Sequence, residues 1–304
     1  MWKNIFGGGN SHSAPERSSG KLPSQGLQQT ILKRLCPKGV PTLPQNARLV
    51  FEITTTPNPD TTALLDIIEQ DESLTARVLK VANSAYFNRG PSVSTPREAL
   101  TVIGTQETCS MLSAGALENM LPSPSPLRGV VWRHNTQTAV AAKVLSAKFN
   151  IQSPSICFTA GLLHDLGKLL FIQRYSIDYM KIWERSESQG VPIDQFELEE
   201  FSFNHCEVGA TIATAWNFAK PVISAIGLHH QSWDVLKNQD LPRLVKLADI
   251  FSYVMRKDLS NKFTAYMEKE LETACEVWSL NNASITLIKK TIESEQSAGE
   301  ALYE

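Results

Sequence analysis

Apolar residues recur every three to four positions along most of this chain, from about residue 26 onward. An early example is the group formed by Leu64, Leu65, Ile67 and Ile68. This spacing places apolar side chains along one face of an α-helix. No segment shows the sustained alternation of apolar and polar residues that is typical of a strand. The pattern therefore predicts an all-α protein without a β-sheet.

Proline residues divide this helical pattern into segments. Residues 95–98 predict a helix start in which Thr95 is the N-cap and Glu98 bonds back to the cap. Three prolines within residues 122–126 cannot lie inside a helix, so a domain boundary is expected there. Beyond this boundary, helices are predicted near residues 127–149, 155–172, 204–217, 219–230, 241–256 and 282–298.

The chain is predicted to have three parts. Residues 1–25 are rich in Gly, Ser, Pro and Gln and too poor in apolar residues to order themselves, which indicates a disordered lead. Residues 26–120 predict an N-terminal helical bundle, and residues 127–300 predict a second helical bundle packed against it. A length of 304 residues suits two domains of ordinary size.

Composition and charge exclude several classes of protein. The net charge is −2, and no block of Lys and Arg marks a nucleic-acid surface. No apolar run approaches the roughly 20 residues that span a bilayer. The 5 cysteines are scattered, as is typical of reduced thiols, and Cys206 is interpreted as a small core residue. We therefore expect a cytoplasmic protein that binds neither nucleic acid nor membrane.

Histidine and aspartate concentrate in the second half of the chain. Residues 161–170 are apolar on every helical face, which predicts a buried segment whose few polar side chains need partners inside the fold. Imidazole and carboxylate together suit Fe, Mn, Zn or Ni. Lys168 lies one helical turn from the pair His164-Asp165. The candidate ligands of one or two divalent ions are His134, His164, Asp165, His205, His229, His230 and Asp249.

Two interpretations of this cluster remain open. Adjacent residues of a helix point about 100° apart, so the two members of His164-Asp165 cannot face one ion from the same direction without bending. Such a pair suits two metal ions with one bridging member, or one ligand with a supporting neighbour. Alternatively, Asp165 bonds to an imidazole and to Lys168 in a buried polar network without metal.

The order of these residues resembles the ligand order of HD-superfamily phosphohydrolases, and most of all their HD-GYP branch. The resemblance implies that Asp165 bridges two metal ions and that Lys168 aids the leaving group or orients phosphate. Two departures count against an enzyme. Residues 231–234 stand where those enzymes have Gly-Tyr-Pro, and Val130 stands where some of them have a glutamate ligand.

A fuller resemblance is to the HDOD family, over about residues 27–260. Residues 68–87 and 94–104 resemble the N-terminal hallmark of that family, which has no counterpart in HD-GYP enzymes. The remaining similarity lies in residues 132–134, 161–168 and 205–210.

This resemblance implies a regulatory or output role in bacterial signalling, exerted through a protein partner. The alternative is a metal-dependent phosphohydrolase acting on nucleotides or cyclic dinucleotides, with Asp165 and Lys168 as its catalytic residues. A third interpretation is a sensor that binds a nucleotide without hydrolysing it.

Overall fold

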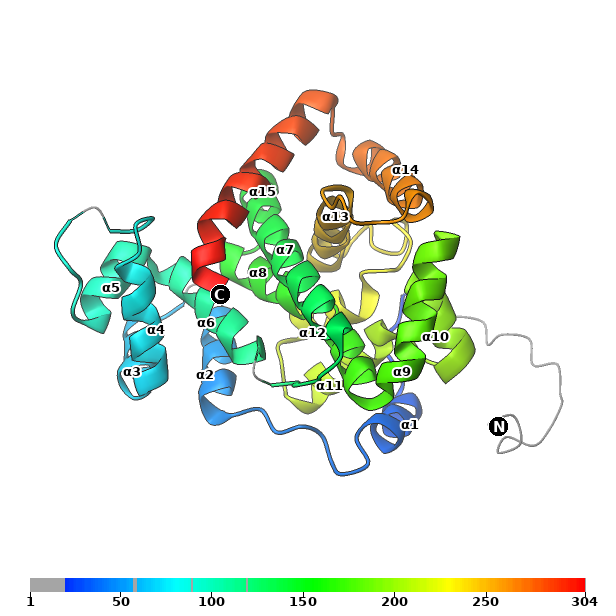
Figure 1. Cartoon of the computed structure of the whole chain (residues 1–304), viewed down its shortest axis with the longest axis horizontal. Helices are drawn as coiled ribbons and strands as arrows, with labels where there is room; N and C mark the ends of the chain where they lie inside the picture. Colours follow the sequence, from blue (N-terminus) through cyan, green and yellow to red (C-terminus); the bar gives the residue numbers. More distant parts are fainter. Residues whose placement is uncertain (1–19, 57–58, 89, 119, 304) are drawn as a thin grey trace, which may run out of the picture.

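The computed structural model describes residues 20–303 except 57–58, 89 and 119. Helices are the only regular secondary structure in that part of the chain, which confirms the predicted all-α fold (Figure 1). Most of the predicted disordered lead, residues 1–19, lies outside the described residues.

The helices follow one another along the whole described chain. In order they are α1 (Gln25–Leu35), α2 (Gln45–Thr54), α3 (Thr61–Glu69), α4 (Glu72–Ala82), α5 (Pro96–Ile103), α6 (Thr105–Glu118), α7 (Pro126–Phe149), α8 (Pro154–Leu163), α9 (Leu166–Gln189), α10 (Ile193–Phe201), α11 (His205–Ala215), α12 (Lys220–Leu228), α13 (Asp240–Val254), α14 (Asn261–Trp278) and α15 (Asn282–Tyr303). The helices α10 and α14 were not among those predicted from the sequence.

A small hydrophobic core joins α3, α4 and α5 to parts of α2 and α6. Leu64 and Ile68 are fully buried in it. The start of α5 has the predicted capping box, because Thr95 and Glu98 each accept a hydrogen bond from the other's backbone N–H. Figure 1 shows α3, α4 and α5 grouped together at one edge of the molecule.

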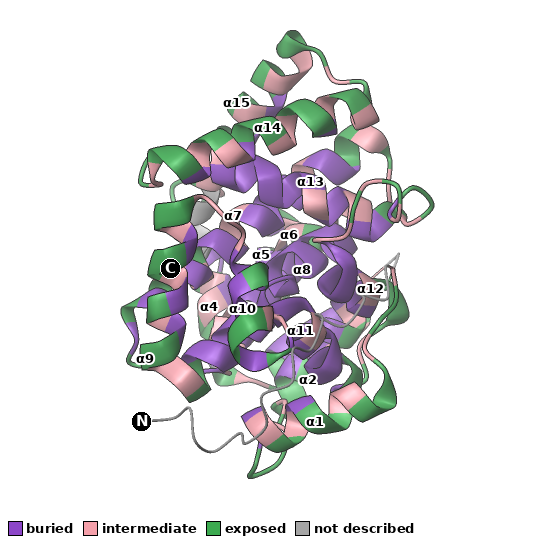
Figure 2. Ribbon diagram, turned by 90° about the vertical axis from the view of Figure 1, so that its right-hand side faces the viewer, coloured by how far each residue is buried: buried purple, intermediate pink, exposed green. Residues whose placement is uncertain are grey.

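A larger core fills the rest of the molecule around α7 and α8, with α9, α11, α12 and α13 packed about them (Figure 2). The first two helices also contribute to it, through Ile31 of α1 and Phe51 of α2. The N-terminal part of the chain thus supplies side chains to both cores. A domain boundary at residues 121–126 stays a prediction.

The chain turns between α8 and α9, where the sequence predicted one continuous helix over residues 155–172. The helix ends at Leu163 and restarts at Leu166, so His164 and Asp165 occupy a turn. The continuous helix was therefore wrong. The backbone of Asp165, with φ −99° and ψ 19°, lets the two side chains of this pair converge, which a regular helix would prevent.

The segment Pro154–Gln189 is long and apolar enough to cross a membrane by composition alone. Its most apolar window is 100% buried inside the fold. A helix that is apolar on all sides and covered by other helices is a core helix, so this segment is explained by the interior of the protein.

Candidate metal centre

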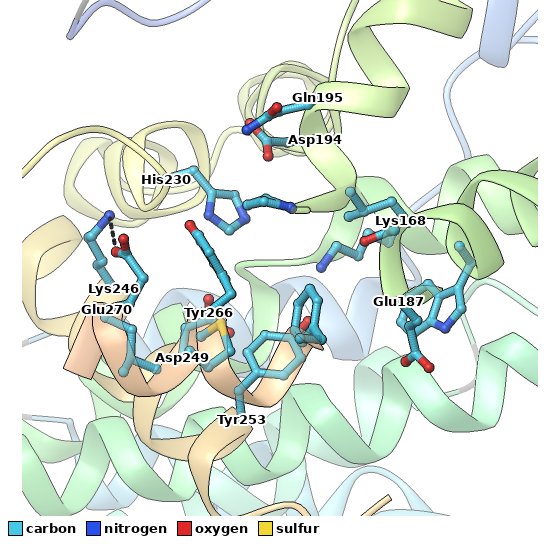
Figure 3. A pocket seen from close by; sticks show the side chains of 17 residues that line it. Lys168, Glu187, Asp194, Gln195, His230, Lys246, Asp249, Tyr253, Tyr266 and Glu270 are labelled. Atoms are coloured by element: carbon cyan, nitrogen blue, oxygen red, sulfur yellow. Dashed lines mark ion pairs between the residues drawn. The ribbon is translucent and has the colours of Figure 1, made fainter. Parts of the chain in front are cut away.

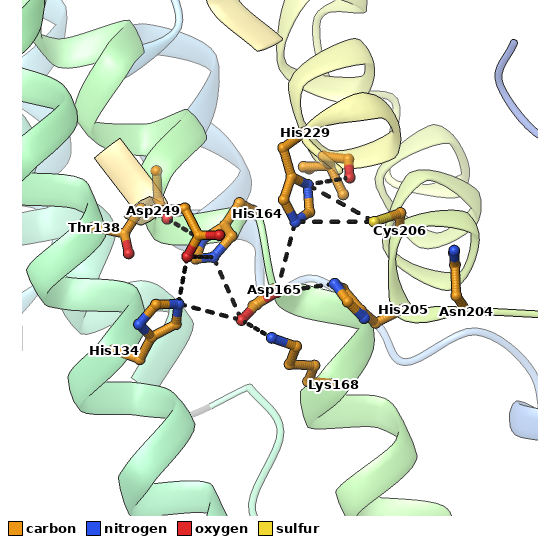
Figure 4. Close-up of polar contacts among 12 residues, drawn as sticks. His134, Thr138, His164, Asp165, Lys168, Asn204, His205, Cys206, His229 and Asp249 are labelled. Carbon is orange, nitrogen blue, oxygen red and sulfur yellow. Dashed lines mark hydrogen bonds and ion pairs between the residues drawn. The ribbon is translucent and has the colours of Figure 1, made fainter. Parts of the chain in front are cut away.

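Separate segments of the second half of the chain bring the predicted site residues together (Figure 4). All are buried except His230, which is half-buried. They come from α7 (His134), the turn between α8 and α9 (His164 and Asp165), the first turn of α9 (Lys168), the start of α11 (His205), the end of α12 (His229 and His230) and α13 (Asp249).

Asp165 lies at the middle of this cluster, with no exposed surface. Its Oδ2 is 2.6 Å from Nζ of Lys168 and 3.4 Å from Nε2 of His164. Its Oδ1 faces another set of rings, at 3.3 Å from Nε2 of His205 and 3.8 Å from Nε2 of His229. The two carboxylate oxygens therefore face two different groups of imidazoles.

The first group consists of His134, His164, Asp165 and Asp249. Oδ1 of Asp249 is 2.9 Å from Nε2 of His134 and 3.6 Å from Nε2 of His164. Nε2 of His134 is also 3.6 Å from Oδ2 of Asp165. Two ligands that each lie about 2.0–2.1 Å from one ion are about 2.8–3.4 Å apart at tetrahedral or octahedral angles. The separations within the first group are close to this range and fit one divalent ion.

The second group consists of His205, Cys206, His229 and His230, each of which offers a ligand atom within 4.8 Å of the others. The thiol of Cys206 is buried, as expected for a core residue, and lies 3.9 Å from the ring nitrogens of His229. Burial raises the pKa of this thiol well above its ordinary value. Oδ1 of Asp165 reaches into this group, so Asp165 is shared between the two.

Hydrogen bonds on the outer side of three rings set their tautomers. Nδ1 of His164 is 2.7 Å from the carbonyl oxygen three residues earlier, and Nδ1 of His229 makes the same contact at 2.9 Å. A carbonyl oxygen can only accept, so each Nδ1 carries a proton. Nδ1 of His205 faces the carboxylate of Glu197 at 2.7 Å in the same way. In the neutral form of each ring, Nε2 is therefore an acceptor that points into the cluster.

His134 follows the same rule through Ser252. The Ser252 hydroxyl donates to the backbone carbonyl of Asp249 at 2.9 Å, and it therefore accepts from Nδ1 of His134 at 3.1 Å. Four imidazoles thus present acceptor nitrogens to two carboxylates in a buried interior. Acceptors facing acceptors repel one another unless a cation lies between them.

Several of these inward atoms lack a hydrogen bond. They are Nε2 of His134, His164 and His205 and Oδ1 of Asp249, none of which has a hydrogen-bond partner among the residues that the structure describes. A buried polar atom without a partner costs about 1–3 kcal/mol. A divalent cation in the first group would satisfy the atoms of His134, His164 and Asp249, and one in the second group would satisfy Nε2 of His205, so the residues present fit metal ions.

Electrostatics favour the ionised form of Asp165 and the neutral rings of His134 and His229, whereas they favour the protonated ring of His164. Burial alone would raise the pKa of Asp165, but His164 and Lys168 hold it well below its ordinary value. Burial lowers the pKa of His134, and it lowers the pKa of His229 well below the ordinary value. Burial would also lower the pKa of His164, but its two neighbouring carboxylates raise it to about 9. This ring therefore carries a second proton, on Nε2, which a bound metal ion would displace.

Residues 40–232 of the chain match the HDOD domain family. The chain belongs to the HDOD family.

Two solved structures share this fold at low sequence identity. A Geobacter sulfurreducens HDOD domain protein with unknown function superposes with a TM-score of 0.71 at 21% identity, over 92% of this chain and 99% of that one. A Shewanella amazonensis protein named as a candidate phosphohydrolase superposes with a TM-score of 0.68 at 19% identity, over 90% and 96% of the two chains. Identities this low establish the fold alone.

A curated relative is an uncharacterized protein of Treponema pallidum, 27% identical over 195 residues. The match covers 63% of this HDOD chain and 37% of that protein, so it spans well under half of the relative's length.

Sequence reasoning missed the residues that orient the HDOD cluster from outside. Glu197 of α10 has no exposed surface and accepts hydrogen bonds from both the backbone N–H and Nδ1 of His205, each at 2.7 Å. Its other oxygen accepts from the hydroxyl of Tyr179 at 2.6 Å. The spacing of apolar residues could not predict this role of Glu197, because the residue that it holds, His205, lies on a different helix.

A cavity of about 140 Å³ adjoins the HDOD cluster between α9, α10, α13 and α14 (Figure 3). Lys168, His230 and Asp249 line it, and so does the ring of Tyr253. Lys168 is held as an ammonium group there: burial would lower its pKa, but Asp165 raises it above the ordinary value. The cavity gives a small molecule a route to one side of the cluster.

Proposed function

We propose that this HDOD protein is a bacterial signalling module whose buried His/Asp cluster binds divalent metal. One observation carries the metal assignment: four imidazoles, each with a proton on the outer nitrogen Nδ1, direct Nε2 toward two ionised carboxylates, and in the neutral ring this Nε2 is an acceptor. A metal-free polar network would instead place donors opposite these acceptors. Membership of the HDOD family supports the signalling role, which requires a protein partner.

The first group would hold one ion through Nε2 of His134, Nε2 of His164 and the carboxylates of Asp165 and Asp249. A second ion would bind His205, His229 and His230, with Asp165 bridging through its other oxygen. Lys168 takes one lone pair of Oδ2, and a carboxylate oxygen has a second lone pair for a metal. Together the two ions would link α7, the turn after α8, α11, α12 and α13, and so stabilise the fold.

A phosphohydrolase is the second candidate, favoured by the cavity beside the cluster. Lys168 and His230 line that cavity, so a phosphate group there would lie next to an ammonium group. A bound divalent ion would supply Lewis-acid activation of water and of a phosphate oxygen. In this candidate, Asp165 holds Lys168 in place, and Lys168 neutralises charge on the phosphate.

Elemental analysis of the purified protein tests the metal assignment. We expect about one to two equivalents of Fe, Mn, Zn or Ni, lost in the double variant His164→Ala/Asp165→Ala. Asp234→Ala, on the exposed surface, is the matched control and should keep its metal. Absence of metal from the unaltered protein, even after reconstitution, would leave the metal-free network as the explanation.

Turnover of a generic phosphodiester by the loaded protein separates the two candidates. A phosphohydrolase should hydrolyse this compound, and the activity should disappear in Lys168→Met. A signalling module without catalytic activity should not hydrolyse it.

A further inference from the structure

A second cavity borders the candidate metal centre at His134, between α7 and the segment that follows α13. Its volume is about 440 Å³, within the range of about 300–1,000 Å³ that is usual for small-molecule sites. His134, which is 2% exposed, forms part of its wall. The cavity therefore extends from the surface to the outer edge of a candidate metal ligand.

The wall of this second cavity is basic. Arg133 comes from α7, and Arg256 and Lys257 come from the segment after α13. Among the described residues of the wall the single carboxylate is that of Asp258, so three cationic side chains face one anionic side chain. This excess contrasts with the whole chain, whose net charge is −2.

Arg256 is arranged as an anion-binding group. Its side chain is 9% exposed, and Asp258 accepts from its Nε at 2.9 Å and from its Nη2 at 3.0 Å. These two bonds fix the plane of the guanidinium. Its Nη1 is buried and has no hydrogen-bond partner in the described part of the chain. A guanidinium held in one plane in the cavity wall fixes a positive charge beside the cavity, a placement that suits a phosphate group.

Two acidic groups act on Arg256, and neither closes the site. Asp258 is 61% exposed, so its charge is screened by water at the rim. Burial lowers the pKa of Arg256, whereas the bonds to Asp258, the nearby Tyr253 and, last, Glu187 raise it. Glu187 lines the cavity of Figure 3 and not this one.

We propose that this second cavity binds a small phosphorylated anion through Arg133, Arg256 and Lys257. The site lies apart from the cavity of Figure 3, whose wall includes four carboxylates, among them Glu187 and Glu270. The volume admits a ligand of diphosphate to mononucleotide size. A ligand in this cavity would contact the wall to which His134 contributes, so its binding would affect a candidate metal ligand. The site itself needs no metal, and its failure is therefore separable from failure of the metal assignment.

Isothermal titration of the full chain with inorganic pyrophosphate tests the proposal, both after treatment with a chelator and after metal loading. We expect pyrophosphate to bind the chelator-treated protein. The variant Arg256→Gln should weaken that binding about 10- to 100-fold, because it removes charge-assisted hydrogen bonds. The double variant Arg133→Gln/Lys257→Gln should weaken it comparably, and it alters exposed side chains that leave the core intact.

Lys33→Gln/Arg48→Gln is the matched control, since it removes two exposed cations from α1 and α2. Its affinity for pyrophosphate should equal that of the unaltered protein. Binding that requires metal and is lost in His164→Ala/Asp165→Ala, but not in Arg133→Gln/Lys257→Gln, would place the anion at the metal centre and overturn the proposal. Absence of binding by the chelator-treated protein at millimolar pyrophosphate would overturn it as well.

Discussion

Glu197 gives the sharpest test of how the candidate metal centre is built, because it contacts no metal ligand atom that faces the cluster. It holds His205 from outside through two hydrogen bonds of 2.7 Å and is itself held by Tyr179. Replacing Glu197 should therefore change metal affinity through the orientation of His205 alone. This prediction rests on the proposed metal assignment.

The magnitude follows from the three hydrogen bonds that Glu197 accepts. Each bond to a charged acceptor contributes about 1.5–3 kcal/mol. Leaving a buried donor without its partner costs about 1–3 kcal/mol, and Glu197→Ala strands three donors, so it should lower the free energy of unfolding by at least about 3 kcal/mol. Loss of a group that orients a histidine ligand typically weakens metal binding about 10- to 100-fold.

Glu197→Gln separates orientation from charge. The glutamine oxygen can accept both bonds from His205, and its amide nitrogen can donate to the hydroxyl of Tyr179. We therefore expect this variant to fold normally and to lose less metal affinity than Glu197→Ala. Glu199→Ala is the matched control, because Glu199 lies on the same helix and its side chain is 63% exposed.

The assay is a competition titration of Zn²⁺ against a chromogenic chelator, with thermal unfolding of the metal-free protein measured in parallel. The first measurement reports metal affinity, and the second reports the stability of the fold. If Glu197→Ala bound Zn²⁺ as tightly as Glu199→Ala, then His205 would not be a ligand positioned by Glu197. Glu197 would then not prepare Nε2 of His205 for a metal ion by holding the ring proton on Nδ1.

Two further predictions concern the backbone and a helix cap. Gly167→Ala should lower both the melting temperature and Zn²⁺ affinity, because a Cβ there would clash with the carbonyl oxygen of His205. A Cβ at Gly129 would have no atom within 4 Å, so the control Gly129→Ala should leave the melting temperature and Zn²⁺ affinity unchanged. Equal melting temperatures of the two variants would contradict this prediction. Asp71→Ala should lower the free energy of unfolding by about 1 kcal/mol at pH 7, because Asp71 caps α4. Hydrogen bonds led by Ser73 lower the pKa of Asp71, so its contribution is present above about pH 4 and is lost as pH falls through the lowered pKa. Urea unfolding at pH 7 and pH 3 checks this, and a difference between variant and parent that was no smaller at pH 3 than at pH 7 would refute it.

Local patterns in the sequence predicted the features that depend on neighbouring residues. The capping box at Thr95 needs only a partner three residues away, and the structure contains it. The apolar stretch at residues 161–170 predicted that Asp165 and Lys168 would be buried, and they are 0% and 2% exposed. The convergence of the cluster was expected from a family resemblance, since no periodicity relates His134 to Asp249.

Features that depend on contacts between distant segments could not be predicted from local sequence patterns. The turn at His164-Asp165 interrupts a stretch whose composition favours one helix, and in the structure Asp165 is surrounded there by Lys168 and imidazoles from other helices. The support of His205 by Glu197 joins α10, which the sequence did not predict, to α11. Both depend on burial of charge at one point in the fold, which hydrophobic spacing does not encode.

The balance of charge within the cluster connects metal stoichiometry to function. Asp165, Asp249 and Glu197 contribute three carboxylates against the single ammonium of Lys168, which leaves a net charge of −2 when the imidazoles are neutral. One divalent ion in the first group cancels this charge, and a neutral buried centre suits a structural role. A second ion would bring the centre to +2 and make it attract an anion, as phosphate chemistry requires. One equivalent of metal would therefore favour the signalling module, and two equivalents would favour the phosphohydrolase.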